Sequence, residues 1–263
     1  MEIIVCIKQV PDTTDVRINP ETNTLIREGV RSVINPFDLY AIEEGIRLRE
    51  QHGGKVWIIA MGPPQAKDAL REALAMGADE AVLISDRAFA GSDTLATSYT
   101  LSQAIKKIGK FDVIICGKQA LDGDTAQVGP GIAVHLMLPQ AAFVKKIEQV
   151  EKRSLTVERM TEEGYDAVKL PLPCLLTVVK EINTPRYTSL VGKVRARRSR
   201  IPTWGPADLN CDTSRLGLAG SPTWVQKIFS PPVRKGGEPL AGTVENIAHI
   251  SKTICDSLLA TRD

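Results

Sequence analysis

Short, wholly apolar runs alternate with amphipathic segments through the first half of the chain. β-Branched residues dominate the runs, whereas the segments between them carry apolar residues every three or four positions. In segment 36–52, Leu39, Ile42 and Ile46 share one helical face, and Asn35 precedes it as an N-cap. The pattern predicts strands at 3–10, 56–61, 82–84 and 113–116, and helices at 36–52, after 61 to 76, at about 92–108 and from about 125.

Apolar strands separated by helices are typical of a parallel sheet that is covered on both faces. After Pro139 the pattern becomes rich in strands and poor in helices, with alternation in LTVERM (155–160) and a continuous apolar stretch in PCLLTVV (173–179). We expect residues 141–180 to form antiparallel additions to the sheet. The predicted fold class is therefore α/β: a doubly wound, mostly parallel sheet with antiparallel additions and a C-terminal arm.

The predicted arm is a long irregular stretch, 202–242, with repeated proline and glycine. A compact monomer seldom keeps so long a segment without regular structure. Its large aromatic side chains nevertheless need burial, which suggests that the arm lies on another subunit. These side chains are Trp204, Trp224 and Phe229. An amphipathic helix at about 243–260 follows and is expected to dock on either chain.

Composition narrows the class of protein. The 263 residues are 43% hydrophobic and 24% charged, with a formal net charge of +2. These values exclude disorder and give no global reason for binding nucleic acid or membrane. The five cysteines form no C-x-x-C pair, and no apolar run is long enough to span a membrane. The first residues, MEIIVCIKQV, begin a strand without a leader pattern, so we expect a cytoplasmic location.

The stretch with the most chemistry is GKQALDGDTAQVGPG (117–131), directly after the strand DVIIC. Ligands of doubly wound sheets bind beyond the carboxyl ends of the strands. Glycines, a threonine and a new helix at that edge offer free N–H groups for phosphate, and Thr125 and Gln127 offer side-chain hydrogen bonds. Asp122 and Asp124 suit an N-cap or a ribose hydroxyl better than a phosphate. The other interpretation of this stretch is a polar strand-to-helix turn with two caps.

Three further segments are expected at the same edge: Cys6–Lys8, Asn35–Asp38 and Ala60–Gly62. Cys6, Ile7 and Met61 would form apolar walls for an adenine. Ser92–Thr94 precedes another helix; it is a capped N-terminus or, in a nucleotide-binding protein, a second contact for phosphate or ribose.

Conventional nucleotide and catalytic motifs are missing from the sequence. No G-x-G-x-x-G follows the first strand, no G-x-x-x-x-G-K-[ST] occurs, and the three histidines form no ligand pattern. We therefore predict no catalytic side chain and no metal site, as suits a protein whose chemistry belongs to a cofactor.

A basic run follows Leu190 and contains five cations without an acid between them: Lys193, Arg195, Arg197, Arg198 and Arg200. A solvated face is the usual meaning of such a run. RNA contact is a second interpretation, although no aromatic platform is interleaved. Docking of an acidic partner, with Leu190 as an exposed apolar anchor, is a third.

Taken together, six stretches resemble the β subunit of electron-transferring flavoproteins over essentially the whole chain. They are VCIKQVPD (5–12), NPFDLYAIEEGIRL (35–48), ALAMGAD (73–79), GKQALDGDTAQVGP (117–130), KLPLPCLLTV (169–178) and INTPRYTSL (182–190). The resemblance implies an adenine nucleotide α-hydrolase-like fold and a heterodimer with a larger α subunit. It implies a nucleotide-binding domain at 1–200, with a recognition loop at about 183–200, and an arm with a helix at 201–263 that packs on the α subunit.

The same resemblance implies a nucleotide site and a docking site. The implied cofactor-binding residues are Cys6, Ile7, Lys8, Asn35, Pro36, Phe37, Asp38, Met61, Asp93, Thr94, Gly117, Lys118, Gln119, Ala120, Leu121, Asp122, Gly123, Asp124, Thr125, Ala126, Gln127 and Val128. The implied partner-docking residues are Leu190, Arg195 and Arg198. Members of the family often carry lysine where this chain has Arg195, Arg197 and Arg198.

Ordinary members hold AMP in this site, whereas bifurcating members hold a second FAD. The loop DGDTAQVGP (122–130) and Asp93–Thr94 resemble the bifurcating group, so FAD is expected, with AMP as the alternative. The resemblance then implies an electron-carrier subunit that oxidises NADH only within the heterodimer or a larger complex. Its implied partners are the α subunit, ferredoxin and a flavin-dependent dehydrogenase or CoA-ester reductase, such as an acyl-CoA dehydrogenase. A non-redox, stress-type ATP-binding module is the further alternative.

Overall fold

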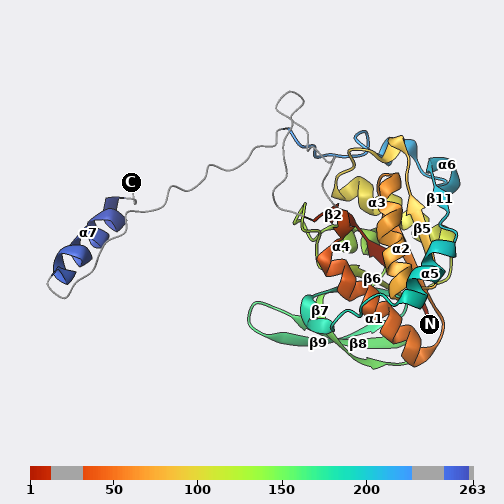
Figure 1. Cartoon of the computed structure of the whole chain (residues 1–263), viewed down its shortest axis with the longest axis horizontal. Coiled ribbons are helices and arrows are strands. Elements are labelled where there is room, and N and C mark those ends of the chain that lie inside the picture. Colours follow the sequence, from red (N-terminus) through yellow and green to blue (C-terminus); the bar gives the residue numbers. More distant parts are fainter. Residues whose placement is uncertain (13–31, 227–245, 261–263) are drawn as a thin grey trace. The chain divides into compact units, whose positions relative to one another are not determined.

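A computed structural model describes residues 1–12, 32–226 and 246–260 (Figure 1). The chain divides into two compact units, Met1–Lys227 and Ile228–Asp263. The part of the predicted arm from 227 to 245, including Phe229, lies outside the described residues.

The first unit alternates strands and helices. Its strands are β1 (Glu2–Ile7), β2 (Gln9–Pro11), β3 (Ser32–Ile34), β4 (Lys55–Met61), β5 (Glu80–Ile84), β6 (Val113–Gly117), β7 (Gln140–Val150), β8 (Ser154–Met160), β9 (Tyr165–Pro171), β10 (Cys174–Val178) and β11 (Thr203–Trp204). Its α-helices are α1 (Pro36–His52), α2 (Lys67–Met76), α3 (Thr94–Ile108), α4 (Val128–Leu136), α5 (Leu190–Arg198) and α6 (Pro206–Leu209). The second unit contains α7 (Ile247–Ala260).

Within the described residues, nine strands form one sheet in the order β11-β5-β4-β1-β6-β10-β7-β8-β9. All pairs from β11 to β7 are parallel, and the β7–β8 and β8–β9 pairs are antiparallel. The last three strands are the green extension at the bottom of Figure 1. The doubly wound α/β fold with antiparallel additions is therefore confirmed.

One strand of the predicted antiparallel set is parallel. The strand β10 lies between β6 and β7 and runs parallel to both. Its five residues are all buried, as a strand with helices or side chains on both faces requires. The continuous apolar run, in place of alternation, is the signal for this internal position.

Alternate residues of β1 enter two different cores, which explains why the strand is apolar throughout. Ile3 and Val5 pack with α1 and α2, whereas Ile4 and Cys6 pack with α3 and α4. The predicted helical face of α1 is confirmed, because Ile42 and Ile46 are buried in the first core. Burial on both faces marks β1 as an internal strand of the sheet.

The structure corrects two local predictions, the start of α4 and the place of Trp204. The helix expected from about Thr125 begins at Val128, because Asp124 and Ala126 have positive φ angles that interrupt a helix. Trp204, expected in the arm, extends the sheet in β11 and packs against the second core of this chain. Among the described residues, none of the helices is long and apolar enough to cross a membrane.

Candidate functional site

The strands β1, β4 and β6 end side by side at one edge of the sheet. Ile7 is in register with Ala60 of β4, and Cys6 is in register with Cys116 of β6. The carboxyl ends of parallel strands therefore bring together predicted residues from distant parts of the sequence. These residues are Lys8, Met61 and Gly117.

Asn35 ties the start of α1 to the loop after β6. Its Nδ2 donates to the Gln119 carbonyl (2.8 Å), and its Oδ1 accepts from the Leu121 N–H (3.1 Å). Asn35 is the N-cap residue of α1, as predicted, but its side chain makes no cap bond to the helix. The amide bridges two segments instead, because both of its polar ends are used by the loop.

Asp38, in the first turn of α1, contacts the end of β1 at the same edge of the sheet. Its Oδ2 accepts from the Lys8 N–H (2.7 Å), and its residue is only 5% exposed. Burial raises the pKa of this carboxyl to about 7, although hydrogen bonds from Lys8, Asn35 and Gly117 oppose the shift. A Cβ at Gly117 would lie 2.3 Å from the Asp38 Oδ1, so only glycine permits this approach.

The loop 117–127 is held by an ion pair with Lys8 and by a hydrogen bond between two of its own side chains. The Lys8 ammonium meets the Asp122 carboxylate at 2.5 Å, and the Gln119 amide donates to the Asp124 carboxylate. The two acids that looked unsuited to phosphate thus already have partners. Lys8 compensates the charge of Asp122, whereas the Asp124 carboxylate is hydrogen-bonded to a neutral amide.

Two helix N-termini converge beside this loop. Thr94, the first residue of α3, donates its hydroxyl to Oε1 of Gln127, which precedes α4, at 3.0 Å. Asp93 caps α3 by accepting from the N–H groups of Leu95 and Ala96, which confirms the predicted cap. Aligned peptide dipoles give each N-terminus a partial positive charge. Because Asp93 already places a carboxylate on the N-terminus of α3 while α4 has no side-chain cap, the N-terminus of α4 is the one suited to an anionic group such as a diphosphate.

The walls of the site are apolar, and its loop is open. Cys6 and Ile7 are buried and Met61 is half-buried. The hydrogen bond with Cys116 and burial raise the pKa of the Cys6 thiol, so it stays protonated and behaves as an apolar wall. A Cβ at Gly123 would meet no atom within 4 Å, which leaves open space in the middle of the loop.

Sequence reasoning missed two features of the site. Lys118 places its ammonium 6.0 Å from the ring centroid of Phe37 and 5.5 Å from that of Phe143. Thr223 donates from its N–H and its hydroxyl to Oδ2 of Asp93, so the end of the first unit reaches the α3 cap. Neither contact has a local signal, because Phe143 and Thr223 are far from their partners in the sequence.

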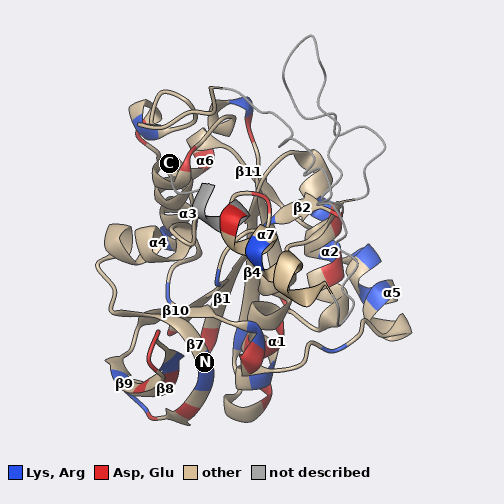
Figure 2. Ribbon diagram, turned by 90° about the vertical axis from the view of Figure 1, so that its left-hand side faces the viewer, with Lys and Arg blue, Asp and Glu red and all other residues tan. Residues whose placement is uncertain are grey.

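The predicted docking residues lie away from the sheet edge, on α5. Leu190 is 82% exposed and Val191 is 81% exposed, while Arg195 and Arg198 belong to the same helix. Figure 2 shows blue lysine and arginine positions along the ribbon of α5, which packs beside α2. The predicted recognition loop therefore contains a helix with an apolar N-terminal turn and a basic last turn.

Comparison with known proteins adds independent findings. Residues 22–209 match the electron transfer flavoprotein domain. The chain is 53% identical over 246 residues to the electron transfer flavoprotein subunit beta of Thermoanaerobacterium thermosaccharolyticum, covering 93% of this chain and 94% of that one. It is 48% identical to the subunit beta of Megasphaera elsdenii, covering 100% and 99% of the two chains. It is 49% identical to the caffeyl-CoA reductase-Etf complex subunit CarD of Acetobacterium woodii, covering 94% of each.

Proposed function

Because the chain belongs to the electron transfer flavoprotein family, we propose that it is a β subunit that binds FAD along the carboxyl edge of its sheet. The observation that carries this proposal is the loop 117–127, which lies beside the N-termini of α3 and α4 and has open space at Gly123. Its partner is the α subunit. The family match favours this function over a non-redox ATP-binding module.

The residues of the edge fit an adenine dinucleotide in three ways. The uncapped N-terminal turn of α4 attracts the diphosphate, and the exposed Thr125 hydroxyl donates to it. Asn35 and Asp38 keep the loop and the end of β1 in place, since both bridge separate segments. The apolar surface of Cys6 and Met61 receives the adenine.

Bound FAD would supply the ring that accepts a hydride from NADH and passes its two electrons on singly, one to ferredoxin and one through the α-subunit flavin to a dehydrogenase or CoA-ester reductase. The chain's own part is to bind and orient the cofactor and to exclude water from its adenine end. A relative at 49% identity is named as part of a caffeyl-CoA reductase complex, which supports a CoA-ester reductase as the final partner.

The loop composition favours FAD over AMP. A single phosphate would need only the N-terminus of α4, whereas a diphosphate and ribityl chain need room beyond it. The small residues of the loop, Thr125 and Ala126, keep that room clear. We further propose that α5 docks the dehydrogenase, with Leu190 as its apolar anchor and cations beside it for steering.

Counting nucleotides in the purified heterodimer tests this function. We expect more than one FAD per heterodimer, with no AMP, after acid release and chromatography. One FAD and one AMP would instead identify the ordinary carrier and remove bifurcation. A colourless protein that retains only ATP would overturn the flavoprotein assignment.

Filling the loop is expected to expel the nucleotide without unfolding the chain. Because no atom lies near a Cβ at Gly123, Gly123→Trp occupies the open space without a clash in the fold. Thr125→Lys replaces a small exposed residue by a long one in the same loop. We expect each to lower the nucleotide content of the β subunit at least tenfold, a change of about 1.4 kcal/mol or more in binding.

Glu163→Trp is the matched control, because Glu163 is exposed in the turn between β8 and β9. Its nucleotide content should equal that of the unchanged chain. Full nucleotide content in both loop variants would mean that the cofactor binds elsewhere.

A further inference from the structure

The helix α5 buries very little of its own surface. Ala196 is its one buried side chain, whereas Leu190, Val191 and Val194 are at least 50% exposed. Nine residues are also too few for a helix that is stable by itself in water. Contacts other than a hydrophobic face must therefore hold α5 in its position.

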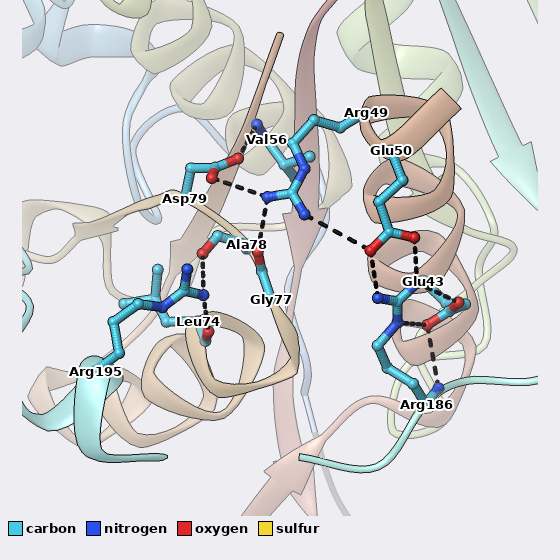
Figure 3. Close-up of polar contacts among 10 residues, drawn as sticks. All are labelled: Glu43, Arg49, Glu50, Val56, Leu74, Gly77, Ala78, Asp79, Arg186 and Arg195. Atoms are coloured by element: carbon cyan, nitrogen blue, oxygen red, sulfur yellow. Dashed lines mark hydrogen bonds and ion pairs between the residues drawn. The ribbon is translucent and has the colours of Figure 1, made fainter. Parts of the chain in front are cut away.

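Two arginines clamp α5 to α2 in a reciprocal arrangement. Nη2 of Arg195, on α5, donates to the carbonyls of Leu74 (2.8 Å) and Ala78 (3.0 Å) at the end of α2 (Figure 3). Nη1 of Arg71, on α2, donates to the Ala196 carbonyl in the last turn of α5 (2.9 Å). The last carbonyls of a helix lack partners within it and carry partial negative charge. Each guanidinium thus satisfies the C-terminal end of the other helix.

The N-terminal turn of α5 is fixed by close approach. A Cβ at Gly192 would lie 2.2 Å from the Ala75 carbonyl oxygen, so the backbones of the two helices meet there. The hydroxyl of Ser189 accepts from the Gly192 N–H at 2.9 Å and caps the helix. The helix is therefore held at both ends before any partner arrives.

The basic run divides into two kinds of residue. Arg195 uses its Nη2 on α2, whereas the side chains of Lys193 and Arg198 make no hydrogen bond or ion pair within the described part of the chain. Both Arg195 and Arg198 line an open apolar groove with Leu190 and Val194, but only Arg198 keeps all of its donors free of bonds to the described residues there. A cation with free donors beside an apolar anchor is suited to meet a carboxylate of a partner.

We propose that Arg195 and Arg71 are positioning residues that hold α5 as a preformed docking surface, and that Arg198 is the cation that meets the dehydrogenase. The proposal rests on the docking role of α5 given above. Arg195, which was expected to contact the partner, is here assigned to holding α5 in place. Preformed geometry favours binding because no ordering of the helix is needed on association.

The test compares Arg195→Met, Arg198→Met and Leu190→Ala in the flavin-loaded heterodimer. The probe is reduction of a CoA-ester reductase that the unchanged heterodimer reduces, measured at low and high salt, with hydrogen exchange of the α5 amides in parallel. Flavin content and flavin reduction by NADH serve as controls and should stay unchanged in all three variants.

For Arg195→Met we expect association to slow about tenfold at every salt concentration, with faster exchange in α5. For Arg198→Met we expect slower association and a weaker dependence on salt, with α5 exchange unchanged. The positioning role would be overturned if association of Arg195→Met lost its dependence on salt while hydrogen exchange of the α5 amides did not become faster. Unchanged transfer by Leu190→Ala would overturn the docking role of α5 and the proposal with it, while leaving the FAD assignment intact.

Discussion

Replacing Arg186 by methionine is expected to lower the free energy of unfolding by about 3–5 kcal/mol. Nε and Nη2 of Arg186 donate to the carboxylate of Glu43 at 2.8 and 3.1 Å, and the Glu43 side chain is only 6% exposed (Figure 3). The same guanidinium donates to Glu50 at 2.6 and 2.9 Å. Without it, a carboxylate stays buried on α1 with no cation beside it, which is the costly half of a broken ion pair.

A double-mutant cycle separates the lost pair from lost packing. We expect Glu43→Gln together with Arg186→Met to recover much of the stability, because no buried charge is then left unpaired. Arg47→Met is the matched control, since Arg47 lies 3.9 Å from Glu44 and its side chain is 45% exposed. Urea denaturation should give a change within about 1 kcal/mol for this control. Equal losses for Arg47→Met and Arg186→Met would mean that burial of Glu43 is not the cause.

The sheet was predictable because a strand that is buried on both faces must be apolar at consecutive positions of the sequence. β1 is apolar at consecutive positions since Ile3 and Ile4 enter different cores, and this pattern is local. The strand at 174–178 has the same pattern, and its parallel pairing shows that a continuous apolar run outweighs the strand-rich context after Pro139. Because this strand follows β8 and β9 directly in the sequence, it was expected to pair antiparallel as they do.

The edge of the site was predictable from topology, but the partners of its side chains were not. Parallel strands must end together, so residues after β1, β4 and β6 meet. Asn35, however, binds a loop 84 residues away, and Arg186 binds Glu43 across 143 residues. No spacing or composition encodes such pairs. The same holds for Arg195, whose place in a basic run conceals that it binds the carbonyls of α2.

The free energy of unfolding is expected to fall by roughly 4 kcal/mol as pH rises from about 4 to about 8, on account of Asp38 alone. Burial raises the pKa of Asp38 from 3.8 to about 7, against hydrogen bonds from Lys8, Asn35 and Gly117. The folded chain therefore holds this proton more tightly than the unfolded chain. Its stabilising effect is complete below the unfolded pKa and is lost as pH passes through the folded pKa.

Asp38→Asn isolates this effect, because an amide does not titrate and has nearly the same shape. At low pH the variant should be less stable by about 1 kcal/mol, since the amide nitrogen cannot accept a hydrogen bond as a carboxyl oxygen does. As pH rises, the unchanged chain loses the contribution of its proton and the variant does not, so the two stability curves should cross below pH 8. Urea denaturation of both proteins across this range measures the difference, in which the other titrating groups cancel. Parallel curves would mean that Asp38 stays ionised, in which case its three hydrogen bonds outweigh burial at the base of the cofactor edge.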